Sequence, residues 1–212
     1  MIGLEKDGGL WTVTLDRADK ANALTEDMLA RLCDIAETAQ DARALILTGA
    51  GKVFSAGADL EAARAGLATS PSWERLSSAI AQLPGLTIAA LNGTVAGGAM
   101  GMVLACDLRL AVPSAKAFYP VMKLGFLPQP SDPGRLAALV GPARAKMILM
   151  AGQKIDAETA LSWGLFDRIV PADTLAAEAR ALAADTLGAD PGIAAGIKAM
   201  CRPASPPTPS TP

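Results

Sequence analysis

Residues 76–106 carry no charged side chain, and this stretch limits what the chain can fold into more than any other. It is long enough to cross a membrane as a helix. However, it contains Pro84, Asn92 and five glycines, which would interrupt such a helix. We therefore interpret the stretch as a helix end, a buried strand and a buried helix of a globular protein, and we predict no membrane association.

Composition excludes several other classes of protein. The formal net charge is −2 and no basic run exists, so nucleic acid is a poor candidate partner. The chain of 212 residues contains no histidine. This absence excludes Ser–His and Cys–His nucleophile pairs, histidine-ligated zinc and histidine general bases. We also predict no metal site.

The cysteines indicate a reducing compartment. Cys33, Cys106 and Cys201 are few, odd in number and widely spaced, which favours free thiols over disulfides. The first residues, MIGLEKDGG, do not resemble a signal peptide, because charges and glycines interrupt them. We therefore expect a cytoplasmic protein.

Patterns typical of strands and helices alternate in the first two thirds of the chain. Strand patterns occur at 10–16, 44–49, 86–93 and 107–112. Helix patterns occur after Thr25, at 71–83 and after the glycines of 97–101. This alternation predicts an α/β fold with crossover connections.

Domain boundaries follow from the remaining pattern. From residue 132 onward the chain reads as mostly helical, with one short strand at 166–170. We expect one domain over 1–200, with a core of about 1–140 and a helical region of about 141–200. Residues 203–212 contain five prolines and no acid, and we predict a disordered tail there.

Two glycine-containing loops share one design. FSAGADL (54–60) and GGAMG (97–101) each follow a predicted strand and lead into a helix. Backbone N–H groups at a helix start lack internal partners, so two facing loops could hold an oxygen that gains negative charge. Alternatively, the small residues only allow strand and helix to pack closely. TGAGKV is not a phosphate-binding loop, because it lacks the first glycine and the Ser/Thr.

Five segments in order give the chain a family resemblance. They are LDRADKANALT, ALILTGAGKVFSAGADL, TIAALNGTVAGGAMGMVLACDLRLA, KLGFLP and LVGPARAKMILMAGQKIDAETALSWGLFDRIVP. From about residue 10 to 187 the chain resembles the crotonase superfamily, the enoyl-CoA hydratase/isomerase family. The resemblance implies a spiral of ββα units with a helical C-terminal region, assembled as a homotrimer or dimer of trimers. It implies an acyl-CoA thioester as ligand, with coenzyme A as part of the substrate and no separate cofactor.

The resemblance also implies roles for individual residues. The backbone N–H groups of Ala58 and Gly98 match the family's oxyanion pair, which stabilises a thioester enolate. The positions matching the coenzyme A site are Lys20, Ala21, Ala23, Ala56, Asp59 and Leu60. From the residues alone, Lys20 is equally an ordinary solvated lysine, Asn22 is expected to make turn hydrogen bonds, and Asp59 to order its loop.

The acids of a standard hydratase are missing. Hydratases of this family use two glutamates, and the matching positions hold Gly101 and Val121. No Asp or Glu lies between Glu74 and Asp107, or between Asp107 and Asp132. Water addition needs a positioned acid and base, so we expect hydration to be weak or absent.

Few groups could replace these glutamates. Asp132 is the best candidate, although Ser131-Asp132-Pro133 also has the pattern of a helix start, where a capping role would lower the pKa of Asp132. Tyr119 could donate a proton or be a core tyrosine with a bonded hydroxyl. Cys106 is expected to be buried and inert.

Two functional hypotheses remain open at this point. The first is an enzyme, a lyase or isomerase of fatty acid metabolism, that uses enolate stabilisation with non-standard acid–base groups. The second is a non-catalytic acyl-CoA-binding or partner-assembly module. The resemblance also suggests a chain that is short at its C-terminus, where the family has further helices over the acyl pocket.

Overall fold

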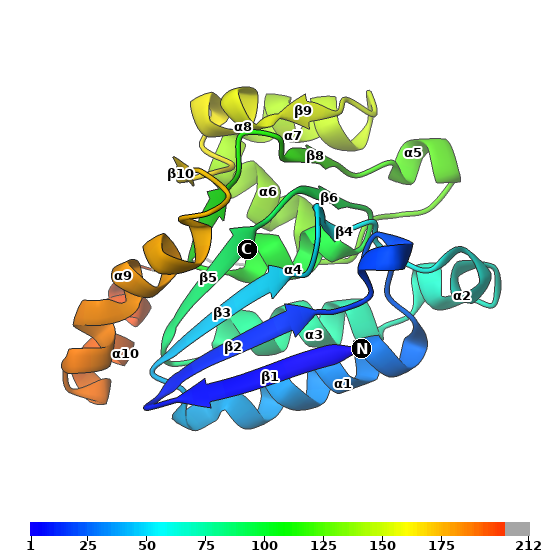
Figure 1. Cartoon of the computed structure of the whole chain (residues 1–212). Coiled ribbons are helices and arrows are strands. Elements are labelled where there is room, and N and C mark those ends of the chain that lie inside the picture. Colours follow the sequence, from blue (N-terminus) through cyan, green and yellow to red (C-terminus); the bar gives the residue numbers. More distant parts are fainter. Residues whose placement is uncertain (202–212) are drawn as a thin grey trace, which may run out of the picture.

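The structure is a computed structural model that describes residues 1–201, and two β-sheets lie at its centre (Figure 1). The predicted tail at 203–212 falls outside the described residues. The larger sheet has the order β1 (Ile2–Asp7), β2 (Leu10–Leu15), β3 (Ala44–Gly49), β5 (Leu86–Leu91), β7 (Leu108–Ala111) and β10 (Arg168–Ile169). The smaller sheet has the order β4 (Val53–Ser55), β6 (Thr94–Ala96), β8 (Lys116–Phe118) and β9 (Ile155–Asp156).

Successive strands alternate between the two sheets. β3, β5 and β7 pair in parallel in the larger sheet, whereas β4, β6 and β8, which follow them in sequence, pair in parallel in the smaller one. A helical segment follows each pair of strands, so the chain advances by one ββα unit at a time. This repetition is the predicted spiral of ββα units.

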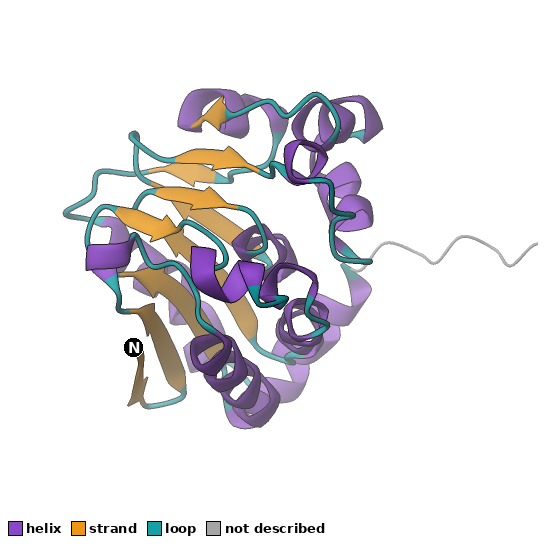
Figure 2. Cartoon of the chain, turned by 90° about the vertical axis from the view of Figure 1, so that its right-hand side faces the viewer, coloured by secondary structure: helices purple, strands orange, loops and turns teal. Residues whose placement is uncertain are grey.

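Most of the helices lie in a layer on one side of the strands, as the view turned by 90° shows (Figure 2). Those before residue 132 are α1 (Glu26–Thr38), α2 (Leu60–Arg64), α3 (Ser72–Gln82), α4 (Ala99–Ala105) and α5 (Val121–Leu124). The others are α6 (Asp132–Val140), α7 (Pro142–Leu149), α8 (Ala157–Trp163), α9 (Leu175–Gly188) and α10 (Pro191–Met200). Three short 3-10 helices, at Ala18–Lys20, Ala39–Asp41 and Leu67–Thr69, lie in connections.

The uncharged stretch forms the centre of the molecule, as predicted. β5 is buried along most of its length, and all seven residues of α4 are buried. Helix α4 packs against α3 on one side and α6 on the other, so charged side chains would find no solvent there. Within residues 1–201, no helix is long and apolar enough to cross a membrane.

Several local predictions are confirmed, and some elements were missed. Thr25 caps α1, because its side chain accepts a hydrogen bond from Met28 N. Strand β1 was not predicted; it forms an antiparallel hairpin with β2 across a turn at Gly8 and Gly9. The short strands of the smaller sheet were also missed, since two or three residues carry too little periodicity to identify. The helical region at 141–200 supplies one strand to each sheet.

Candidate active site

A cavity of about 380 Å³ lies where strands β4, β6 and β8 end. The loops after β4 and β6 contribute Ala58 and Gly98, and the segment after β8 contributes Tyr119 and Val121. Trp73, at the start of α3, closes one side. The wall is mainly apolar, which suits a ligand with a hydrocarbon part.

The two glycine loops meet at this cavity. Gly57 has a φ of +90°, and an ideal Cβ at this position would lie 2.8 Å from the carbonyl oxygen of Ala96. Any larger residue would push the loops apart, so glycine permits this close approach. As a result, Ala58 and Gly98 face the same space although they belong to different ββα units.

Among the residues that the structure describes, the backbone N–H groups of Ala58 and Gly98 have no hydrogen-bond acceptor. Leu24 pairs with Ala58 through Leu24 N to Gly57 O (2.7 Å) and Asp59 N to Leu24 O (2.8 Å). This bridge uses the carbonyl oxygen of Gly57 and the N–H of Asp59, so the N–H of Ala58 takes no part in it. Gly98 directly precedes α4, where N–H groups lack intrahelical acceptors. Within residues 1–201, neither N–H donates a hydrogen bond.

Buried polar groups hold the loop that carries Ala58. Asn22 is fully buried and accepts a local hydrogen bond from Arg17 N at Oδ1 (2.8 Å), as the turn prediction requires. Its amide nitrogen also donates to the carbonyl oxygens of Ala50 (2.9 Å) and Val53 (2.7 Å), two distant residues that the prediction did not include. Ser55 Oγ donates to Asn22 O (2.8 Å) and accepts from Gly57 N (3.1 Å). This network fixes the backbone immediately before Ala58.

Asp59 orders the next part of the loop. Its carboxylate caps α2 by accepting hydrogen bonds from Glu61 N (3.0 Å) and Ala62 N (3.4 Å). Its other oxygen pairs with Arg17 Nη1 at 2.7 Å. The Arg17 hydrogen bond, helped by these N–H groups, holds the pKa of Asp59 below its usual value, so the residue is a structural anion.

The positions matched to the coenzyme A site divide into two groups. Ala56 and Leu60 line the cavity, whereas Lys20, Ala21, Ala23 and Asp59 are not part of its lining. Ala21 lies next to the cavity edge, because its carbonyl oxygen accepts a hydrogen bond from Ala56 N at 3.0 Å. Lys20 is exposed.

Asp132 is completely buried against Gly101. An ideal Cβ at Gly101 would lie 2.9 Å from Asp132 Oδ1 and 3.1 Å from Oδ2. Tyr119 donates its hydroxyl proton to Asp132 Oδ2 at 2.9 Å. Within residues 1–201, Asp132 Oδ1 accepts no hydrogen bond, and Arg135 Nη1 lies 3.9 Å from it.

This geometry contradicts the predicted capping role. Helix α6 begins at Asp132, but neither Ser131 nor Asp132 makes a side-chain cap. The pKa of Asp132 is raised to about 6 rather than lowered, because burial outweighs the hydrogen bond from Tyr119 and the charge of Arg135. Burial also raises the pKa of Tyr119, with Asp132 adding to the effect.

Glu74, which the sequence identifies only as the acid before an acid-free stretch, is a second carboxylate near Asp132. It lies in the first turn of α3 and accepts hydrogen bonds from both Ser131 N (3.0 Å) and Ser131 Oγ. Its negative charge contributes to the raised pKa of Asp132. The one sequence feature that could have drawn attention to Glu74 is that it is the last acidic residue before the uncharged stretch at 76–106.

Cys106 behaves as predicted. The thiol is buried in the segment after α4, and burial raises its pKa to about 12. It is therefore a neutral thiol and a poor nucleophile.

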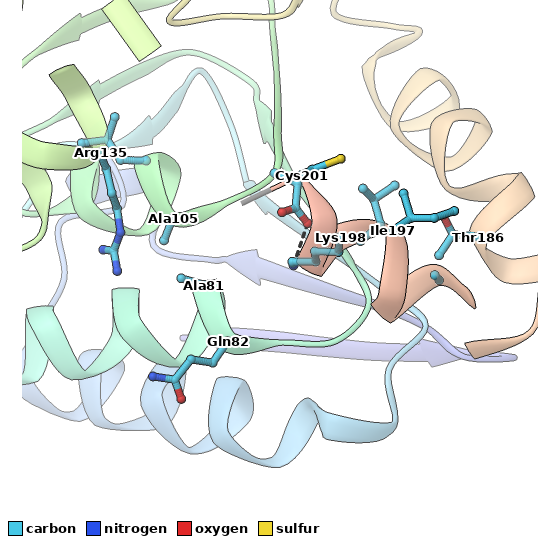
Figure 3. Close-up of a pocket in the computed structure, with 12 residues that line it drawn as sticks. Ala81, Gln82, Ala105, Arg135, Thr186, Ile197, Lys198 and Cys201 are labelled. Carbon is cyan, nitrogen blue, oxygen red and sulfur yellow. Dashed lines mark ion pairs between the residues drawn. The ribbon is translucent and has the colours of Figure 1, made fainter. Parts of the chain in front are cut away.

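A second cavity, of about 700 Å³, lies among the ends of α3, α4 and α10 (Figure 3). Lys198 of α10 pairs there with Asp107 at 2.7 Å and donates to Gly85 O at 2.9 Å. Arg135 points into this cavity from α6 (Figure 3). Although this cavity is larger, the unbonded N–H pair lies in the smaller one, where the candidate active site is therefore placed.

Comparisons with known proteins agree with this architecture. The family model described as "Enoyl-CoA hydratase/isomerase" matches residues 5–210. The chain is 35% identical over 205 residues to carnitinyl-CoA dehydratase of Citrobacter koseri, covering 93% of this chain and 78% of the relative. It is 33% identical over 187 residues to 1,2-epoxyphenylacetyl-CoA isomerase of Escherichia coli, covering 82% and 71%.

A solved structure gives the same result. The structure of Pseudomonas aeruginosa DspI superimposes with a TM-score of 0.85 at 33% sequence identity, over 94% of this chain and 85% of that one. The fold is thus that of crotonase-type α/β proteins. This chain belongs to the enoyl-CoA hydratase/isomerase family.

Proposed function

We propose that this chain binds an acyl-CoA thioester and stabilises its enolate through the N–H groups of Ala58 and Gly98. The observation that carries the proposal is that Ala58 and Gly98 line one apolar cavity and that, within residues 1–201, their N–H groups donate no hydrogen bond. Two preorganised donors lower the energy of an oxyanion that forms on the thioester carbonyl. The names of the two relatives, a CoA-ester dehydratase and a CoA-ester isomerase, support this substrate class.

The reaction we propose is proton transfer at the thioester α-carbon, as in an isomerase or lyase, rather than standard hydration. The positions that match the family's glutamates hold Gly101 and Val121. Asp132 is the titratable group nearest Gly101, and its pKa of about 6 suits a proton acceptor near neutral pH. Coenzyme A enters as part of the substrate.

One observation favours a second candidate function. Within the described part of the chain, no aspartate or glutamate lines the cavity that holds Ala58 and Gly98. A chain that only binds acyl-CoA would have such a cavity. Turnover of any acyl-CoA by the purified protein decides between the two candidates.

Calorimetric titration with butyryl-CoA tests the binding site. An ideal Cβ at Gly98 would lie 2.9 Å from the Trp73 ring, so Gly98→Ala and Gly98→Pro both crowd that ring. Only the proline removes the N–H. We expect Gly98→Pro to bind about tenfold more weakly than Gly98→Ala, the value of one lost hydrogen bond. Equal affinities in two folded variants would show that the N–H does not contact the thioester.

A further inference from the structure

We infer that the proton moving between the substrate and Asp132 passes through the hydroxyl group of Tyr119. This inference rests on the proposed function and adds a residue to it. Tyr119 both lines the cavity of Ala58 and Gly98 and donates a hydrogen bond to Asp132. It is also the only tyrosine in the chain.

Asp132 cannot meet the substrate directly in this arrangement. Its side chain is 0% exposed and is not part of the cavity lining. The backbone of Gly101 lies against one side of the carboxylate, and the Tyr119 hydroxyl lies 2.9 Å from Oδ2. Tyr119 is the residue that both lines the cavity and contacts this carboxylate, so it offers a route from a bound substrate to Asp132.

Backbone pairing holds Tyr119 close to the N–H pair. It directly follows β8, and β8 pairs with β6, the strand that leads into Gly98. Gly97 N donates to Phe118 O at 3.2 Å, which ties the loop of Gly98 to the residue before Tyr119. Tyr119 is thus fixed at both ends, by the pairing of β8 at its backbone and by Asp132 at its hydroxyl group.

The Asp132 oxygen that does not contact Tyr119, Oδ1, has a cationic neighbour. Oδ1 accepts no hydrogen bond and faces Arg135 at 3.9 Å. Arg135 is itself held by Ser77 Oγ at 2.8 Å and reaches the second cavity (Figure 3). When the proton leaves Asp132 again, the negative charge of the carboxylate is therefore partly offset by the nearby Arg135 cation.

The step conserves protons and electrons. The α-carbon–hydrogen bond of the thioester breaks and its proton forms a new bond to the Tyr119 oxygen. At the same time the original hydroxyl proton moves to Asp132, so Tyr119 stays neutral throughout. The electron pair of the broken bond passes into the enolate, whose oxygen is held by Ala58 and Gly98 N–H. The reverse sequence returns a proton to carbon.

Hydrogen–deuterium exchange at the α-carbon of butyryl-CoA in D2O, followed by NMR, tests the relay. We expect Tyr119→Phe to lower the exchange rate about 100-fold, the usual value of a positioned proton-transfer group. Its calorimetric affinity for butyryl-CoA should remain close to wild type, whereas its urea midpoint should fall, because Asp132 Oδ2 loses its hydrogen-bond donor. Asp132→Asn should lower exchange similarly and also abolish the pH dependence, which a purely structural role would leave in place. Trp163→Phe, in α8 and outside the cavity lining, is the aromatic control.

Three outcomes would overturn the inference. If Tyr119→Phe exchanges within about threefold of wild type while Asp132→Asn does not, Asp132 meets the substrate directly. If the wild-type protein binds butyryl-CoA without exchange, the relay is wrong but the proposed binding site stands. If the wild-type protein does not bind butyryl-CoA at all, both proposals fail together.

Discussion

The carboxylate of Asp132 fills the space that a side chain at position 101 would need. The two lie on different helices, α6 and α4, and an ideal Cβ on Gly101 would come within 2.9 Å of Asp132 Oδ1. Position 101 therefore has room only for glycine while the Asp132 side chain occupies this place. An acid is thus present beside α4 although α4 itself carries none.

Gly101→Ala should displace Asp132 and destabilise the protein. Overpacking at a buried backbone contact costs about 1–3 kcal/mol. We expect a lower urea midpoint and slower α-proton exchange. The matched control is Gly134→Ala in α6, where no atom lies within 4 Å of the added Cβ. In an Asp132→Ala background the cost of Gly101→Ala should shrink; an unchanged cost would mean that another neighbour is responsible.

Stability should depend on pH through Asp132. Its pKa in the folded protein is about 6, above the unfolded value of 3.8, so the folded state binds more protons between these limits. Stability from this group is therefore present below about pH 4 and is lost as pH rises through 6. The rise in pKa corresponds to about 3 kcal/mol.

Urea denaturation from pH 4 to 8 measures this effect. Relative to Asp132→Asn, the wild-type protein should lose stability as the pH rises. The groups that act on the pKa of Asp132 are Tyr119, Arg135 and Glu74. Glu74 is also a carboxylate, so its titration has to be distinguished from that of Asp132. The variant Glu74→Gln does so: in that background the pKa of Asp132 should fall, because a negative neighbour is removed. A pH-independent difference between wild type and Asp132→Asn would argue against a raised pKa.

The α-proton exchange rate should rise with pH and level off above about 6. Asp132 must be ionised to accept a proton, and its pKa is about 6. Rates measured from pH 5 to 8 at saturating butyryl-CoA give this midpoint. A profile that keeps rising to high pH would instead indicate a group with a higher pKa, such as the Tyr119 hydroxyl.

Hydration of crotonyl-CoA should be slower than the roughly 10 s⁻¹ typical of enzymes. Among residues 1–201, no carboxylate lines the cavity to hold and activate a water molecule. Loss of the ultraviolet absorbance of the conjugated thioester measures the rate, with a hydratase that has both glutamates as the positive control. Turnover at the rate of that control would require an acid and base that we have not identified.

Lys198→Met should loosen α10. Lys198 is 12% exposed and pairs with Asp107, which also accepts hydrogen bonds from Thr87. Loss of this charged hydrogen bond should cost about 1–2 kcal/mol after allowance for partial solvent exposure. Amide hydrogen exchange in 191–200 should accelerate. Lys146→Met, on the exposed side of α7, is the control and should leave α10 unchanged.

Much of the fold could be predicted from the sequence because the signals are local. The uncharged stretch at 76–106 has to be buried, and it forms β5 and α4. Thr25 caps α1 as expected, because a cap contacts only the first helical turn and can be recognised from neighbouring residues. The two glycine loops were also recognisable, since each combines a strand end, small residues and a helix start within a few positions.

The role of Asp132 was decided only by the tertiary structure. Locally, Ser131-Asp132-Pro133 is a good helix start, and capping was the better prediction. The side chain instead turns inward, because Gly101 leaves room on α4 and Tyr119 supplies a donor. These partners come from separate ββα units, and no pattern within a few residues reports how distant segments pack. The sequence alone thus determined most of the longer elements, whereas packing between them determined which groups meet and raised the pKa of one buried carboxylate to about 6.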